Sequence, residues 1–259
     1  MSDVVALEVS GLQKHFGGLL AVCDVSLQVR HGSLTALIGP NGAGKTTVFN
    51  LITNLFTPSA GGVHLYGTSL RGKTPGDIAK LGLIRTFQSA RVFPGMTVLE
   101  NVMSGRHRLF GHSTTAQLLR LPSARAAERK LREEAHAFLE LVGLDRYRDT
   151  HAADLPMGAQ KLLEVVRALM AKPRVLLLDE PAAGLNDSET AKFAALLRAV
   201  SAAGVTLLLV EHNMQLVMGV ADHIVVLESG SVIAKGAPSQ IQSDPRVIAA
   251  YLGEDKESA

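Results

Sequence analysis

Short aliphatic runs alternate with segments of helical periodicity over much of the chain. Val175–Leu178 is an aliphatic run, and Val205–Val210 is aliphatic except for Thr206; both are typical of strands that a sheet buries on both faces. Between them, Ser188–Val200 carries its apolar residues on one face of a helix. This alternation predicts a largely parallel sheet with helices on both sides. The same criteria predict strands at Leu34–Ile38, Ile224–Leu227 and Val232–Ala234, and helices at Thr47–Leu55, Gln160–Met170 and Pro245–Leu252.

The N-terminal part of the chain has a different pattern. Val5–Val9 and Val22–Val29 alternate between apolar and polar residues, and Gly17 and Gly18 indicate a turn between them. A further short strand is expected at Val63–Tyr66. Two alternating strands joined by a glycine turn favour antiparallel pairing. We therefore expect an N-terminal antiparallel β-subdomain.

The segment from residue 93 to residue 144 contains no convincing strand. Thr97, with Glu100 three residues later, has the spacing of a capping box at the start of a helix. Ser123–Val142 is amphipathic, and Gly143 is typical of the residue that follows the end of a helix. The segment therefore predicts a helical subdomain inserted into the α/β core.

Composition limits the classes of function. The 259 residues are 47% hydrophobic, so a sizeable core is expected. The net charge is only +2, so no general attraction to nucleic acid is expected. A single cysteine, Cys23, excludes an internal disulfide. The apolar runs are too short to span a bilayer, and the N-terminus lacks the pattern of a signal peptide. We therefore expect membrane association only through a partner protein.

The most specific motif lies between the predicted strand Leu34–Ile38 and the helix that follows it. It reads Gly39, Pro40, Asn41, Gly42, Ala43, Gly44, Lys45 and Thr46, followed by Thr47. Glycines let successive main-chain N–H groups point at one anion, and the helix N-terminus adds its positive dipole. Lys45 is expected to reach the β- and γ-phosphates, and the Thr46 hydroxyl to bind Mg²⁺. The motif therefore predicts a nucleoside triphosphate site.

Two later strand ends carry side chains suited to the same site. Asp179 ends the run from Val175 and is expected to bind Mg²⁺, while Glu180 is placed to polarise an attacking water. His212 follows the neighbouring run Val205–Val210, where a side chain would meet the γ-phosphate. Neither signal is specific alone, because acidic residues and histidines often lie at strand ends for structural reasons.

In its whole set of motifs the chain resembles the ATP-binding cassette of ABC transporters, over nearly its full length. Gly39–Thr47 resembles the Walker A motif and Leu178–Pro181 the Walker B motif. The remaining likenesses are Gln88 to the Q-loop glutamine, Leu155–Gln160 to the signature, Ala183–Asn186 to the D-loop, His212 to the switch histidine, and Phe16 to the aromatic residue that stacks on adenine.

The resemblance implies a fold and a division of the chain. The fold class is α/β: a P-loop NTPase with a RecA-like core, an N-terminal antiparallel β-subdomain and an inserted α-helical subdomain. Residues 1–259 would form a single ABC ATPase domain. Within it, residues 1–88 and 161–235 would form the nucleotide-binding core with the β-subdomain, 89–160 the helical subdomain with the signature, and 236–259 a C-terminal helical tail.

The resemblance also implies a mechanism and partners. Two cassettes, identical or different, would close face to face on two ATP molecules, each held between one subunit's Walker A motif and the other's signature. Closure would move transmembrane permease subunits, so the chain would lie in the cytoplasm against the inner face of the plasma membrane. Gln88 would contact Mg²⁺ and the γ-phosphate and couple them to the helical subdomain. No nucleic acid partner is implied.

The signature departs from the commonest family sequence, Leu-Ser-Gly-Gly-Gln. Pro156 stands in place of the serine, Met157 in place of a glycine and Ala159 in place of the glutamine, while Gly158 is retained. A proline cannot offer the hydroxyl that would bind the partner's γ-phosphate. It does suit the first turn of a helix, whose other N–H groups can still face an anion. We therefore expect Pro156 and Gly158 to form a usable but weaker contact with the partner's ATP.

The stretches that flank these motifs are similar to branched-chain amino-acid importer cassettes of the Liv type. They are Arg85–Asn101, Asp179–Asn186, Val210–Gly219 and Ile248–Glu254. Other readings stay open: a cassette for urea, amides or exported lipopolysaccharide, or a soluble ABC-type ATPase outside transport. A cassette does not touch its cargo, so its sequence does not decide between cargoes.

Overall fold

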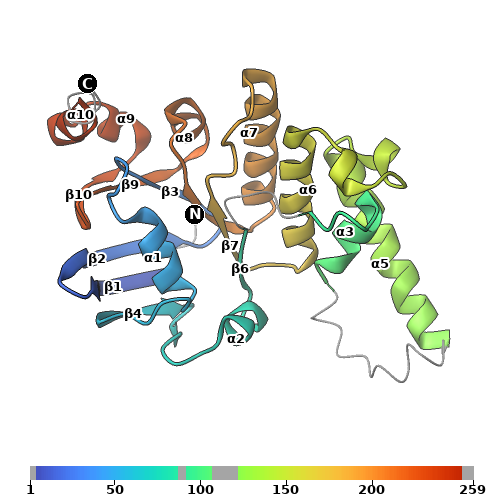
Figure 1. Cartoon of the computed structure of the whole chain (residues 1–259), viewed down its shortest axis with the longest axis horizontal. Coiled ribbons are helices and arrows are strands. Elements are labelled where there is room, and N and C mark those ends of the chain that lie inside the picture. Colours follow the sequence, from blue (N-terminus) through green and yellow to red (C-terminus); the bar gives the residue numbers. More distant parts are fainter. Residues whose placement is uncertain (1–3, 87–91, 107–121, 253–259) are drawn as a thin grey trace. The chain divides into compact units, whose positions relative to one another are not determined.

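The computed structural model describes residues 4–86, 92–106 and 122–252, and these form two compact units. One unit contains residues 1–88 and 174–259, and the other contains residues 89–173 (Figure 1). The second unit ends at Pro173, whereas the sequence placed the end of the helical subdomain at residue 160. The reason is that α6 is one continuous helix, Met157–Met170, and it belongs wholly to the second unit.

A six-stranded sheet forms the centre of the first unit, in the order β10-β9-β3-β8-β7-β6. Every neighbouring pair is parallel except β9 and β10, which form the expected hairpin. The strands are β3 (Leu34–Ile38), β6 (Leu83–Arg85), β7 (Val175–Asp179), β8 (Thr206–Val210), β9 (His223–Glu228) and β10 (Ser231–Gly236). The predicted parallel sheet is therefore confirmed, although the three-residue strand β6 was not predicted.

The N-terminal strands form a separate antiparallel sheet, in the order β2-β1-β4-β5. Its strands are β1 (Val5–Phe16), β2 (Leu19–Arg30), β4 (Ala60–Leu65) and β5 (Thr68–Ser69). Gly17 and Gly18 lie in the turn between β1 and β2, as expected. The predicted antiparallel subdomain is thus present, with strands longer than the alternating pattern indicated.

Helices cover the parallel sheet on both faces. On one face, Val48 and Phe49 of α1 share an apolar core with Leu37 of β3 and with residues of the antiparallel sheet. On the other face, Ala36 and Ile38 pack with residues of α8, β9 and the C-terminal helices. Successive residues of β3 therefore enter opposite cores, which explains why four of its five residues are apolar and why Thr35 is buried with them. The helices of this unit are α1 (Lys45–Ile52), α2 (Pro75–Lys80), α7 (Asp187–Ala202), α8 (Met214–Val220), α9 (Pro238–Gln242) and α10 (Pro245–Leu252).

The second unit is helical and has its own apolar core. Its elements are α3 (Val98–Ser104), α5 (Pro122–Leu141), η1 (Asp145–Tyr147), η2 (Ala152–Asp154) and α6 (Met157–Met170). Thr97 and Glu100 form the expected capping box at the start of α3. Gly143 follows α5 with a φ of 70°, and the N–H of Leu144 donates to the Leu139 carbonyl at 2.8 Å. This is the predicted helix end.

None of the helices in the described part of the chain is both long and apolar enough to cross a bilayer.

Candidate active site

The predicted phosphate loop joins the end of β3 to the start of α1. β3 lies in the interior of the sheet, hydrogen-bonded to β8 on one side and β9 on the other. The helix begins at Lys45, two residues earlier than the sequence indicated, with Gly44 at its N-cap and a φ of 97°. The N–H groups of the first helical turn therefore point toward the loop, which is the arrangement that binds an anion.

Two glycines of the loop have no space for a side chain. Gly39 has a φ of 148°, and a Cβ atom there would lie 2.0 Å from the carbonyl oxygen of Leu227 in β9. At Gly44 a Cβ atom would lie 2.8 Å from the carbonyl oxygen of Ala21 in β2. The loop is thus pressed against two strands, and its glycines are required by its path.

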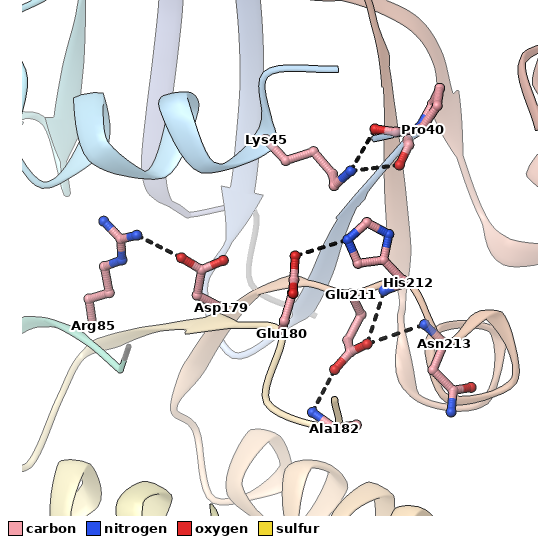
Figure 2. Close-up of polar contacts among 10 residues, drawn as sticks. Pro40, Lys45, Arg85, Asp179, Glu180, Ala182, Glu211, His212 and Asn213 are labelled. Carbon is pink, nitrogen blue, oxygen red and sulfur yellow. Dashed lines mark hydrogen bonds and ion pairs between the residues drawn. The ribbon is translucent and has the colours of Figure 1, made fainter. Parts of the chain in front are cut away.

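Lys45 turns back over the loop. Its side chain is buried, and its Nζ donates hydrogen bonds to the carbonyl oxygens of Gly39 at 2.7 Å and Pro40 at 2.8 Å (Figure 2). The ammonium group is therefore held against the carbonyl oxygens at the start of the loop. A positive charge in that place suits the terminal phosphates of a nucleotide.

Asp179 ends β7 with its carboxylate almost fully buried. Its Oδ2 accepts a hydrogen bond from Arg85 Nη2 at 2.6 Å, and the two side chains are only 3% and 10% exposed. Arg85 Nη1 also donates to Asn50 Oδ1 of α1 at 2.7 Å. Within the described residues, Asp179 Oδ1 is buried and has no hydrogen-bonding partner. A buried carboxylate oxygen without a partner is able to bind a cation.

Glu180 and His212 come together from the ends of neighbouring parallel strands. His212 Nε2 lies 2.9 Å from Glu180 Oε1, and the nitrogen is the donor because the carboxylate can only accept (Figure 2). Glu180 has a φ of 47°, which is uncommon for a residue with a side chain, and its N–H donates to the Val210 carbonyl at 2.9 Å. Glu180, the residue expected to act as the base, thus has a strained backbone conformation, and such strain is frequent at functional sites.

Glu211, which the sequence reading passed over, is also buried at this place. Its carboxylate accepts hydrogen bonds from the N–H groups of Ala182, His212 and Asn213 (Figure 2). A charged residue directly after the five-residue buried strand β8 was the only sequence signal for it. Arg85 was missed in the same way, because β6 was not predicted.

The remaining predicted residues are placed as follows. Thr46 is exposed in the first turn of α1, and Phe16 is exposed at the end of β1, with its ring edge-to-face with Phe56 at 5.3 Å. Thr47 follows in α1 and is half-buried. Asn41, Gly42 and Ala43 complete the loop between Pro40 and Gly44. Gln88 lies outside the described residues.

The signature segment belongs to the second unit. Pro156 is the N-cap of α6, with a φ of −54° and a ψ of 151°, so it precedes the first turn in which the sequence placed it. Its carbonyl accepts from the N–H of Gln160 at 3.0 Å. The helix starts at Met157, three residues before the predicted start, and Gly158 is buried in its first turn. An extended ψ excludes Pro156 from the helix itself, but its carbonyl still takes the first helical hydrogen bond.

A glycine loop between a parallel strand and a helix, with a buried carboxylate at a nearby strand end, defines a phosphate-loop nucleotide-binding protein. A family model described as "ABC transporter" matches residues 22–183, and one described as "Branched-chain amino acid ATP-binding cassette transporter" matches residues 231–257. The chain therefore belongs to the ABC transporter family, as an ATP-hydrolysing ATP-binding cassette.

Relatives with assigned roles match along nearly the whole chain. The chain is 47% identical over 249 residues to the high-affinity branched-chain amino acid transport ATP-binding protein BraF of Pseudomonas aeruginosa, covering 96% of this chain and 98% of BraF. It is 43% identical over the same length to the corresponding protein LivG of Escherichia coli, with the same coverage.

Solved structures agree with this assignment. The ADP conformation of an ATP-binding cassette of an ABC transporter matches with a TM-score of 0.83 and 32% identity, covering 96% of this chain and 99% of that one. A nucleotide-free cassette matches with a TM-score of 0.82 and 32% identity, covering 95% and 98%.

Proposed function

We propose that this chain hydrolyses ATP to power an importer of branched-chain amino acids. The cargo assignment is supported by the roles given to BraF and LivG and by the match of residues 231–257 to a model for branched-chain amino acid cassettes. Permease subunits would receive the work of hydrolysis, and the chain would lie at the cytoplasmic face of the membrane that contains them.

The observation that carries the catalytic assignment is the pairing of Glu180 with His212 at 2.9 Å beside the phosphate loop. Glu180 would accept a proton from the attacking water as general base. His212 would contact the γ-phosphate once Glu180 turns to the water. The main-chain N–H groups of the loop and the Lys45 ammonium would stabilise the charge that develops on the phosphates.

The residues present fit a magnesium ion. Asp179 has a buried oxygen without a partner among the described residues, and Thr46 offers a hydroxyl in the first turn of α1. Oxygen ligands of this kind are those that Mg²⁺ prefers. When bound with ATP, the ion would neutralise charge on the phosphates. Gln88 is the third proposed ligand.

A second cassette would complete the site. Phe16, exposed at the end of β1, is the proposed stacking platform for adenine. Pro156 and Gly158 would meet the ATP bound by the partner cassette rather than the ATP of their own chain. The start of α6 supports this role, because its N–H groups remain available to an anion although Pro156 brings no hydroxyl.

The catalytic assignment is tested with Glu180→Gln, which keeps the shape of the side chain and removes its basicity. We expect hydrolysis to fall at least about a hundredfold, within the range that a positioned general base contributes. Binding of ATP should remain, because the phosphate loop is unchanged. Lys45→Ala is the contrasting variant and should lose binding itself. Equal turnover in Glu180→Gln and the unsubstituted chain would refute the assignment.

The cargo is tested by transport in the organism that encodes the chain. Replacing the chromosomal copy with the Glu180→Gln variant should abolish high-affinity uptake of radiolabelled leucine, isoleucine and valine. Uptake of lysine serves as the control and should be unchanged. Unaltered leucine uptake, or a loss confined to urea or amide uptake, would overturn the branched-chain amino acid assignment while leaving the ATPase assignment intact.

A further inference from the structure

Glu211 connects the two catalytic strand ends through its side chain. It is 2% exposed, and its Oε1 accepts from the Ala182 N–H at 2.6 Å. Its Oε2 accepts from the N–H groups of His212 at 2.9 Å and Asn213 at 3.2 Å. No basic side chain among the described residues forms an ion pair with it. A carboxylate that leaves water is therefore stabilised by three main-chain donors from two separate segments.

The two segments are the ones that carry the catalytic pair. Ala182 lies two residues after Glu180, and Pro181 between them has no N–H to offer. The Ala182 N–H is therefore the first main-chain donor available after the strained turn at Glu180. On the other side, Glu211 holds the N–H of His212 itself. The segments that follow β7 and β8 are thus joined twice: by the hydrogen bond between Glu180 and His212, and by the Glu211 carboxylate (Figure 2).

The segment beyond Ala182 is anchored as well. Asn186 is the N-cap of α7 and forms a capping box with Glu189. The D-loop, residues 183–186, is therefore fixed at its far end by a helix cap and at its near end by Glu211. Loss of the near anchor would remove the link between Ala182 and Glu211, while the main-chain hydrogen bonds of Glu180 to Val210 and of Ala183 to Glu180 would remain.

We propose that Glu211 is a positioning residue for ATP hydrolysis, whose buried carboxylate sets the distance and register between Glu180 and His212. The inference rests on the proposed catalytic role of Glu180. Glu211 touches neither substrate nor reacting atoms, and it acts only through the two loops that it joins. A carboxylate is needed because all three partners are donors. The amide of a glutamine has a single acceptor oxygen, and its NH₂ group would face an N–H.

The test uses Glu211→Gln in the full chain assembled in its transporter complex. Turnover should fall about 10- to 100-fold, since small displacements of catalytic groups have effects of this size. The Kd for ATP should stay within about twofold, because the phosphate loop does not touch Glu211. Glu211→Asp keeps the charge but shortens the reach by one methylene, and should give an intermediate turnover.

A matched control separates positioning from general stability. Glu100 also accepts a main-chain N–H, from Thr97 at 2.8 Å, and lies in the helical unit. Glu100→Gln should lower the denaturation midpoint without lowering turnover. Glu211→Gln should lower turnover at temperatures well below its own midpoint.

A double-mutant cycle with Glu180→Gln decides whether Glu211 acts through Glu180. Single-turnover rates with radiolabelled ATP should show that Glu211→Gln adds little further loss once Glu180 is substituted. Turnover of Glu211→Gln within about twofold of the unsubstituted chain, or a full additional loss in the Glu180→Gln background, would overturn the inference. Failure of the proposed function looks different, because Glu180→Gln would then itself retain full turnover.

Discussion

Replacing Gly39 with alanine tests the packing of the phosphate loop against β9. The added Cβ would lie 2.0 Å from the Leu227 carbonyl oxygen, whereas ordinary contact begins at 3.4 Å. The two strands would have to separate by the difference, about 1.4 Å. β3 and β9 are hydrogen-bonded neighbours at this end, where Ile38 is paired with Val226. The added methyl group therefore creates a clash, and relieving that clash would break hydrogen bonds between β3 and β9.

The cost follows from two contributions. A side chain at the Gly39 φ of 148° is strained, and strain of this kind costs about 1–3 kcal/mol. Opening the end of the ladder leaves one or two buried main-chain groups without partners, at about 1–3 kcal/mol each. We expect Gly39→Ala to lower the free energy of unfolding by about 2–9 kcal/mol.

Gly42→Ala is the matched control within the same loop. Gly42 also has a positive φ, 77°, but a Cβ atom there would meet nothing within 4 Å. Its cost should be the conformational penalty alone, about 1–2 kcal/mol. Comparing the two variants therefore isolates the contact with Leu227.

Urea unfolding followed by circular dichroism measures the difference, with and without ATP and magnesium. The comparison should use denaturation midpoints, because a chain of two units need not unfold in one step. Gly39→Ala should have the clearly lower midpoint and the weaker ATP binding. Equal midpoints for the two variants would refute the argument that β9 restricts the loop.

Three further predictions concern stability. Arg85→Met should lower the free energy of unfolding by about 3–5 kcal/mol in the absence of magnesium, because the buried Asp179 carboxylate loses the Arg85 guanidinium as its partner. An unchanged urea midpoint would contradict this. Asn101→Leu should lower the free energy of unfolding, measured in urea, by at least about 3 kcal/mol, because the fully buried side-chain amide accepts from the Phe93 N–H and donates to the carbonyls of Phe93 and two other residues. A loss below about 1 kcal/mol would contradict the role of these hydrogen bonds. Burial lowers the pKa of His223 below its ordinary 6.5, so the unfolded state takes up protons first and stability falls as pH drops below about 6.5. His223→Gln should make that fall shallower between pH 7.5 and 5.5, and identical slopes would contradict it.

The sequence predicted those parts of the site that depend on local pattern. The loop from Gly39 to Thr46 is contiguous, and its flanking strand and helix have clear periodicities, so its structure could be expected. Asp179 and Glu180 follow a buried aliphatic run, and the parallel sheet places such strand ends together. The topology placed Glu180 and His212 at the same site, but the sequence did not predict the hydrogen bond between them.

The parts that were missed depend on contacts between distant positions. Arg85 pairs with Asp179 across 94 residues, and Glu211 reaches Ala182 across 29. Neither has a local signature, because a charged residue at a strand end is ordinarily solvated. The start of α6 was placed too late because Pro156 and Gly158 weaken a helical pattern. Only the fold showed that the proline lies just outside the helix.

The contacts of the phosphate loop have a consequence for biosynthesis. The loop itself is translated early, but its main-chain neighbours include Leu227 in β9 and Gly230, whose N–H donates to the Ala43 carbonyl at 3.0 Å. A ribosome-bound nascent chain that stops before these residues lacks the surface against which the loop is shaped. The capacity to hold ATP should therefore arise only after the hairpin of β9 and β10 has emerged from the ribosome.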